Sequence, residues 1–230
     1  MGEVVIRVEN NLLNTPSTGR ISTMSVTVGV DEAGVGCAWG NLWASAVHIQ
    51  TPIPGLCDSK KMTEKKRERM RTEVLATARY GMGEVTHVEI DEMGLGEARR
   101  LVFERALDNF AHKYDCIPDH IIVDGTLYRP WRDVAFTLEP RADSTYPCVS
   151  AASVLAKTSR DRQVIEWCNG PFGDVYAPYG IRNNKGYLSR NHIDAIRELG
   201  RTPVHRHSYQ IRSLVTPHTH PVTSPPDVPE

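Results

Sequence analysis

Short runs of apolar residues along the chain predict β-strands. The first run covers residues 26–30 and the second covers residues 41–49, with a glycine-rich link between them. Two β-rich runs joined by a short link are typical of an antiparallel pair. Residues 84–90 alternate polar and apolar positions, as a half-buried strand does. Two more apolar runs, residues 120–123 and 134–138, predict further strands.

Apolar residues at spacings of three and four positions predict helices between these strands. Thr63 can cap a helix that turns Met70 and Val74 toward the core. Residues 103–111 carry apolar side chains at the i, i+3, i+4, i+7 and i+8 positions of an amphipathic helix. We therefore expect both helices to pack against the sheet.

Two further helices are predicted in the second half of the chain. Residues 149–156 are mostly small and apolar, which indicates a buried helix, and Pro147 is tolerated in its first turn. Ser189 can cap a last helix that ends at Gly200. Its inward-facing residues are expected to be Ile193, Ile196 and Leu199. Strands that come first and then alternate with helices indicate a mixed sheet covered by helices.

These elements fit one α/β domain in a chain of 230 residues. Residues 1–21 contain Asn-Asn, Pro and Ser-Thr-Gly and indicate an N-terminal arm, so the domain is expected to cover residues 22–212. Residues 213–230 are rich in Pro, Thr, Ser and His, which predicts a disordered tail. No apolar stretch resembles a signal peptide or reaches the roughly 18 residues of a membrane span.

Charge and cysteine content limit the expected partners and the expected cellular compartment. The net charge is only −1, so any attraction to nucleic acid must come from a local patch. The five cysteines are odd in number and form no C-x-x-C pair, which disfavours a disulfide framework or a zinc ribbon. A reducing, cytoplasmic setting is the simplest interpretation.

Acidic residues border the apolar elements at three points. Asp31 and Glu32 follow the first strand, Asp124 follows the run at residues 120–123, and Asp143 comes shortly before the buried helix. Taken singly, each acid could simply end a strand or cap a helix. Four converging carboxylates would repel one another unless a divalent cation lay between them, and oxygen ligands suit Mg²⁺ or Mn²⁺. The pattern by itself leaves convergence open.

Two other clusters carry weaker signals. Residues 60–71 hold seven basic and two acidic residues, a run that is typical of a solvated helix face. His205 and His207 lie near the predicted tail, and their spacing matches no zinc pattern. A metal site at these histidines is therefore disfavoured.

Six blocks of the sequence, taken in order, resemble the ribonuclease HII family. They include a glycine-flanked Asp-Glu-Ala-Gly loop, an Asp-Ser-Lys-Lys segment, a Val-Asp-Gly step and an Asn-Lys-Gly-Tyr segment. The six blocks lie at residues 28–36, 57–67, 123–125, 142–162, 184–187 and 202–209. One short block would carry little weight, whereas six in family order are a specific signal.

The resemblance implies a fold, a site and an activity. The fold would be ribonuclease H-like, with a five-stranded mixed sheet and helices on both faces. Asp31, Glu32, Asp124 and Asp143 would form a catalytic site that binds Mg²⁺ or Mn²⁺, with a two-ion mechanism. The enzyme would hydrolyse the RNA strand of RNA/DNA hybrids and nick DNA duplexes at embedded ribonucleotides, leaving 3′-hydroxyl and 5′-phosphate ends. We expect it to act as a monomer.

The resemblance also implies residues that bind the substrate. Tyr187 would pack against the ribose at the RNA-to-DNA junction, although by itself it could be a half-buried core tyrosine. Ser59 and Lys60 would contact backbone phosphates, which predicts salt-sensitive binding.

A glycine loop at Gly34, Val35 and Gly36 would read the ribose 2′-hydroxyl through its main chain, because glycine permits close approach. The family usually has arginine between the two glycines. Val35 keeps the main-chain contact but removes a charged side chain, so the preference for a single embedded ribonucleotide is expected to weaken.

Three other interpretations fit the sequence less well. A dinucleotide-binding loop is disfavoured because Gly34, Gly36 and Gly40 miss the G-x-G-x-x-G spacing, and two adjacent acids would repel a pyrophosphate. A catalytically silent hybrid-binding module would not need the four acids that are present. Another nuclease or resolvase on the same fold could share the acids, but the lysine and tyrosine blocks favour ribonuclease HII.

Overall fold

The computed structural model describes residues 25–56, 62–126, 128–211 and 214. The predicted arm at residues 1–21 lies outside this part of the chain, and so does the predicted tail apart from Leu214. None of the described helices is long and apolar enough to cross a membrane.

The strands form one mixed sheet in the order β3-β2-β1-β4-β5. β1 pairs with β2 and β2 pairs with β3 in antiparallel fashion, whereas β4 is parallel to both β1 and β5. The bounds are Thr27–Ala33 for β1, Leu42–His48 for β2, Arg79–Val85 for β3, His120–Asp124 for β4 and Ala135–Glu139 for β5. This is the predicted five-stranded mixed sheet, and the predicted antiparallel first pair is confirmed.

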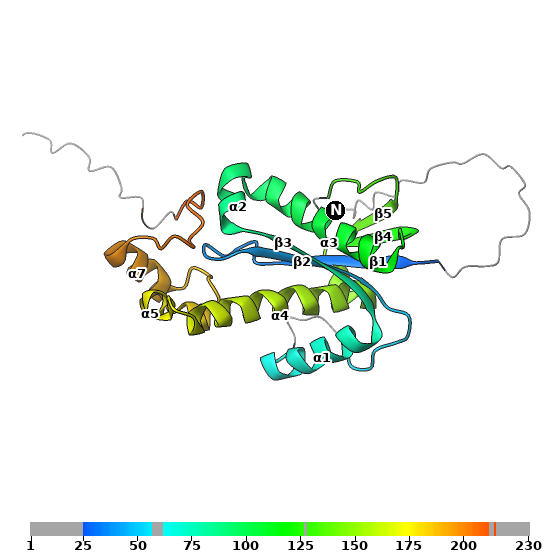
Figure 1. Ribbon diagram of the computed structural model, residues 1–230, viewed down its shortest axis with the longest axis horizontal. Coiled ribbons are helices and arrows are strands. Elements are labelled where there is room, and N and C mark those ends of the chain that lie inside the picture. Colours follow the sequence, from blue (N-terminus) through cyan, green and yellow to red (C-terminus); the bar gives the residue numbers. More distant parts are fainter. Residues whose placement is uncertain (1–24, 57–61, 127, 212–213, 215–230) are drawn as a thin grey trace, which may run out of the picture.

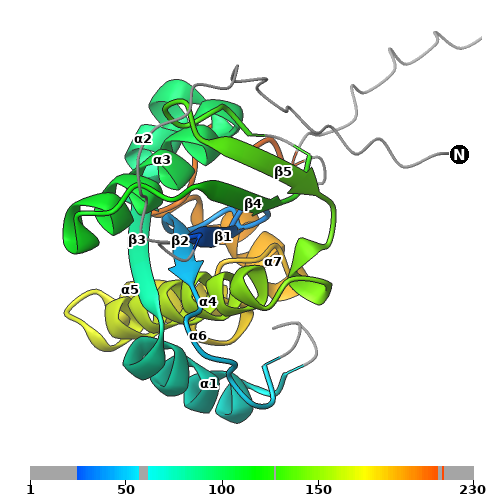
Figure 2. The ribbon, with the colours of Figure 1, turned by 90° about the vertical axis from the view of Figure 1, so that its right-hand side faces the viewer.

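Helices cover both faces of the sheet, as predicted. Figure 2 shows α3 on one face and α4 on the other, with α1 outside α4. α5 and α7 lie at one end of the molecule (Figure 1). The bounds are Glu64–Thr77 for α1, His87–Met93 for α2, Leu95–Tyr114 for α3, Pro147–Asn169 for α4, Gly173–Tyr176 for α5, Ile181–Asn184 for α6 and Arg190–Leu199 for α7. Short 3-10 helices lie at Ala142–Ser144 (η2) and Ala177–Tyr179 (η3).

Glycines set the short distance between the sheet and its two long helices. A Cβ on Gly81 or Gly83 of β3 would collide with the backbone of α3. A Cβ on Gly29 of β1 would collide with the backbone of α4 at Cys148 and Val149. Because these positions carry no side chain, the start of α4 lies directly against the middle of β1.

The predicted helix caps are confirmed. The Thr63 hydroxyl accepts from Lys66 N–H at the start of α1, and the Ser189 hydroxyl accepts from His192 N–H at the start of α7. Pro147 lies in the first turn of α4, whose residues from 149 to 156 are all buried.

Two predictions about local structure were wrong. Residues 84–90 are not one strand, because β3 ends at Val85 and α2 begins after Thr86. Thr86 and Glu89 form a reciprocal capping box, which starts a helix where alternation alone predicts a strand. Leu199 is 55% exposed rather than inward-facing, because it is the last residue of α7 and extends past the buried stripe that ends at Ile196.

Candidate active site

Three carboxylates from separate segments meet at one edge of the sheet. Asp31 lies toward the end of β1, Asp124 is the last residue of β4, and Asp143 lies in η2 just before α4. Because β1 and β4 are parallel neighbours in which Val30 pairs with Val123, the aspartates that follow lie side by side. One carboxylate oxygen from each of the three aspartates lies within 4.8 Å of the other two.

A hydrogen bond fixes the third aspartate against the two strands. Ala142 N–H donates to Oδ1 of Asp124 over 2.9 Å, which ties η2 to the end of β4. On its other side η2 leads into α4, whose first turn is held against Gly29 of β1. The segment that carries Asp143 is thus attached to both strands that carry the other two aspartates.

Two of the three aspartates are buried, Asp124 is partly buried, and the cluster carries excess negative charge. Asp31 is 6% exposed and Asp143 is 2% exposed. Burial raises the pKa of Asp31 well above its usual range, and the nearby charges of Glu32 and Asp124 raise it further. Hydrogen bonds from Ser153 and from Glu32 N–H, the latter 2.7 Å long, oppose this rise. Buried oxygen-only ligands this close together fit a divalent cation of the Mg²⁺ or Mn²⁺ type.

Glu32 lies beside this cluster but is held differently. Its Oε1 accepts from Nη2 of Arg99 over 2.6 Å, and its Oε2 is buried without a hydrogen-bond partner. Burial raises the pKa of Glu32, and the arginine partly offsets the rise. The structure therefore brings together three of the four acids named from the sequence, with the fourth in an ion pair. Sequence analysis missed Arg99, which lies in α3 and carries no motif.

The glycine loop and the candidate ribose-packing tyrosine lie next to each other. A Cβ on exposed Gly36 would lie 3.6 Å from the ring of Tyr187, and Cys37 forms a β-bridge with that tyrosine. Tyr187 is 45% exposed, which disfavours a role in the core. Val35 is partly buried and packs against the apolar cluster under α3, so its side chain does not extend freely into solvent.

Two buried arginines hold this loop, and the sequence analysis did not single them out. Arg160 of α4 donates to the carbonyls of Trp39, Asn41 and Lys185 over 2.7 to 3.2 Å. Arg206 donates to the carbonyls of Gly34, Gly40 and Asn41 over 2.7 to 3.1 Å. Gly34 has a φ of +104°, and a Cβ there would collide with the Arg160 side chain. The loop is therefore fastened both to α4 and to the segment just before Tyr187.

The described histidines of this block, His205 and His207, lie close to the same loop, whereas His218 and His220 lie outside the described residues. Thr202 N–H donates to Nδ1 of His205 over 2.8 Å, so the proton of the neutral ring lies on Nε2. The Nε2–H of His205 donates to Nε2 of His192, with 3.0 Å between the two nitrogens. The Nδ1–H of His192 in turn donates to the carbonyl of Tyr187 over 2.9 Å. Burial is the main cause that lowers the pKa of His205 to about 3. His207 is exposed, whereas the ring nitrogens of His205 are taken up by Thr202 and His192.

The basic run at residues 60–71 is only partly described, and the proposed phosphate contacts Ser59 and Lys60 lie outside the described residues. Arg71 donates to the hydroxyls of Thr158 and Ser159, so this arginine fastens α1 to α4.

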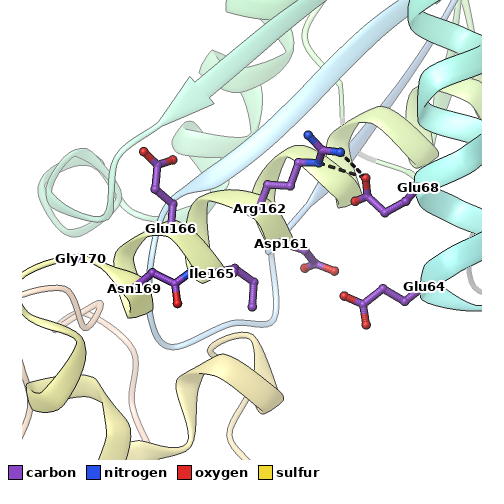
Figure 3. Close-up of a pocket in the computed structure, with 8 residues that line it drawn as sticks. All are labelled: Glu64, Glu68, Asp161, Arg162, Ile165, Glu166, Asn169 and Gly170. Atoms are coloured by element: carbon purple, nitrogen blue, oxygen red, sulfur yellow. Dashed lines mark hydrogen bonds and ion pairs between the residues drawn. The ribbon is translucent and has the colours of Figure 1, made fainter.

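Acids make up half of the residues that line the groove between α1 and α4 (Figure 3), and Arg162 is the one basic residue among them. The carboxylates of Glu64 and Asp161 face one another across it, and Glu68 pairs with Arg162 over 2.5 Å. Because phosphate is repelled by acids, nucleic acid is not expected to follow this groove.

Comparison with known proteins agrees with this arrangement. The family model described as "Ribonuclease HII" matches residues 28–212. A ribonuclease HII of Marinomonas sp. (strain MWYL1) is 36% identical over 197 residues, which cover 84% of this chain and 94% of that protein. The ribonuclease H2 structure from Pyrococcus horikoshii OT3 is 26% identical, with a TM-score of 0.65, and the match covers 80% of this chain and 93% of that one.

A more distant structure shares the fold. Bst-RNase HIII, solved in complex with Mn²⁺, is 18% identical with a TM-score of 0.58, over 80% of this chain and 75% of that one. The matched segment of the family model contains all four acids, the glycine loop and Tyr187. With its mixed sheet, its buried aspartate cluster and relatives that match most of its length, this chain belongs to the ribonuclease HII family of nucleases.

Proposed function

We propose that this enzyme hydrolyses the RNA strand of RNA/DNA hybrids and nicks DNA duplexes at embedded ribonucleotides. The reaction requires divalent cations and leaves 3′-hydroxyl and 5′-phosphate ends. The main support for the proposal is the convergence of three aspartates from β1, β4 and η2, whose ligand oxygens lie within 4.8 Å of one another; Asp31 and Asp143 are buried and Asp124 is partly buried. This arrangement is costly without a cation. Membership of the ribonuclease HII family supports it.

Asp31, Asp124 and Asp143 would hold Mg²⁺ or Mn²⁺, and Glu32 would complete the set of carboxylates. Bound in a pair, such ions activate a water molecule and stabilise the leaving oxygen of a phosphodiester. The chain's own contribution is to fix the ligand oxygens: the bond from Ala142 N–H orients Asp124, and burial keeps bulk water from screening the site.

The ribose of the substrate would be recognised next to the cluster. The proposed reader of the 2′-hydroxyl is the main chain of Gly34, Val35 and Gly36, because this hydroxyl distinguishes RNA from DNA. Tyr187, partly exposed beside Gly36, would pack against the sugar. Ser59 and Lys60 are proposed to contact backbone phosphates. Since Val35 offers no charge, the preference for a single embedded ribonucleotide over a long hybrid is proposed to be weak.

The test is cleavage of two duplexes, one with a single ribonucleotide and one with a long RNA/DNA hybrid, in Mg²⁺ or in Mn²⁺. We expect cuts in both, with products that carry 5′-phosphates and 3′-hydroxyls. Asp124→Asn is expected to abolish cleavage while the protein stays folded, and Asp133→Asn, at an exposed position, serves as the matched control. Failure of the wild-type protein to cut either duplex with either ion, while still binding hybrid, would favour a silent binding module.

We also propose that the enzyme acts as a monomer in the cytoplasm. All three clustered aspartates come from one chain, so no second copy is needed to build the cluster. The four described cysteines are free, which suits a reducing compartment. A sedimentation experiment that gives the mass of a dimer at micromolar concentration would contradict the monomer.

A further inference from the structure

Glu32 and Arg99 form an ion pair at the edge of the aspartate cluster. Arg99 lies in the second turn of α3, and its Nη2 lies 2.6 Å from Oε1 of Glu32. The two side chains are only 21% and 10% exposed respectively. Because solvent screens this contact poorly, the pair is expected to be stronger than an ordinary ion pair at the surface.

The positive charge of this pair lies directly beside the proposed ligands. A Cβ on Gly125 would lie 3.7 Å from Nη2 of Arg99, and Gly125 directly follows Asp124 on β4. Glu32 directly follows Asp31 on β1. One guanidinium therefore faces both strands that supply the first two aspartates.

The pair is also incomplete. Oε2 of Glu32 and Nε of Arg99 are both buried and lack a hydrogen-bond partner. A two-pronged contact between guanidinium and carboxylate would use both atoms, whereas a single contact leaves each group partly unsatisfied. The free oxygen of Glu32 is thus available to a cation that binds among the neighbouring aspartates.

We propose that Arg99 is a positioning residue that competes with the divalent cation for Glu32, and so weakens cation binding as long as nucleic acid is absent. The inference rests on the proposed metal-dependent function. Four ionised carboxylates carry four negative charges, which two divalent cations would neutralise in full. Arg99 adds one positive charge, which matches the single negative charge of a phosphodiester. Complete loading with cations is therefore favoured once the phosphate of a substrate is in place.

The first test is calorimetric titration of Mn²⁺ into the full chain without nucleic acid. Arg99→Gln keeps an amide that can donate to Glu32 but removes the charge. It is expected to bind Mn²⁺ about tenfold more tightly, because Glu32 no longer has to leave a poorly solvated ion pair before it contacts the cation. Arg99→Lys keeps the charge and is expected to remain near the wild type. Arg100→Gln is the matched control, because Arg100 pairs with Glu97 instead.

A double-mutant cycle tests whether the effect passes through Glu32. In a Glu32→Gln background, Arg99→Gln is expected to raise the Mn²⁺ affinity by only about two- to threefold, because direct repulsion between the guanidinium and the cation is then the sole remaining effect. Thermal unfolding in EDTA checks that each variant is folded, and Arg99→Met, which keeps the apolar stem, replaces Arg99→Gln if the latter is not.

The outcomes separate this inference from the proposed function. Tighter Mn²⁺ binding that depends on Glu32 supports the role of Arg99. Unchanged or weaker binding, or an equal gain with and without Glu32, overturns it while leaving metal-dependent cleavage intact. If neither the wild type nor any variant binds Mn²⁺ without nucleic acid, the role of Arg99 is refuted, and the metal-dependent function is decided separately by the cleavage assay in Mg²⁺ and Mn²⁺.

Discussion

Replacing Asp31 with Asn is expected to stabilise the cation-free protein while it abolishes cleavage. The substitution removes one charge from a group whose three oxygens lie within 4.8 Å of one another. At that separation two unit charges repel by about 3.5 kcal/mol at an effective dielectric constant of about 20, and by about 0.9 kcal/mol in a water-like medium. The Asn oxygen can still accept the hydrogen bond from Glu32 N–H. We therefore expect the free energy of unfolding in EDTA to rise by about 1–3 kcal/mol.

The assay is urea unfolding of the wild type and of Asp31→Asn, each in EDTA and in Mg²⁺. Mg²⁺ should stabilise the wild type and should have less effect on the variant, because one ligand charge is missing. Asp133→Asn, at an exposed position, controls for the general effect of removing a carboxylate. An Asp31→Asn variant that is less stable than the wild type in EDTA would refute the view that repulsion dominates this cluster.

Two further predictions concern the support of the site. The folded-state pKa of His205 is about 3, below the roughly 6.5 of an unfolded histidine, so its neutral form is favoured by folding and its protonation favours unfolding. Lowering the pH from 7 to 5 should therefore reduce the free energy of unfolding of the wild type by about 1–2 kcal/mol more than that of His205→Gln. Urea unfolding at both pH values measures this difference, and an equal pH dependence of the two proteins would contradict the prediction. Gly34→Ala should destabilise the protein by about 1–3 kcal/mol or more, because it combines a φ of +104° with a collision against Arg160. Gly96→Ala in α3, where a Cβ meets nothing within 4 Å, should instead be neutral or slightly stabilising, and a loss of stability similar to that of Gly34→Ala would refute the argument.

The sequence by itself determined the elements that carry the aspartates. The apolar runs before Asp31 and before Asp124 are enough to predict the two strands that carry these acids. The predicted end of the first strand at Val30 was wrong, because β1 continues to Ala33 and pairs Asp31 and Glu32 with β2. Caps at Thr63 and Ser189 were predictable for a similar reason, since capping depends on neighbouring residues alone. The capping box of Thr86 and Glu89 is an equally local signal, and it starts α2 although the alternation of polar and apolar residues favours a strand.

Only the tertiary structure decided which acids meet. Asp31 and Asp124 are adjacent because β4 pairs in parallel with β1, and no local signal encodes a pairing between segments so far apart in the sequence. The ion pair between Glu32 and Arg99, and the bonds from Arg160 and Arg206 to loop carbonyls, likewise join residues from distant segments. Such contacts depend on how closely the helices approach the sheet. Gly29 in β1 and Gly81 and Gly83 in β3 permit a close approach, but they do not determine which side chains then meet. Local sequence patterns therefore determined the strands and helices, and the packing of these elements determined which residues form the site.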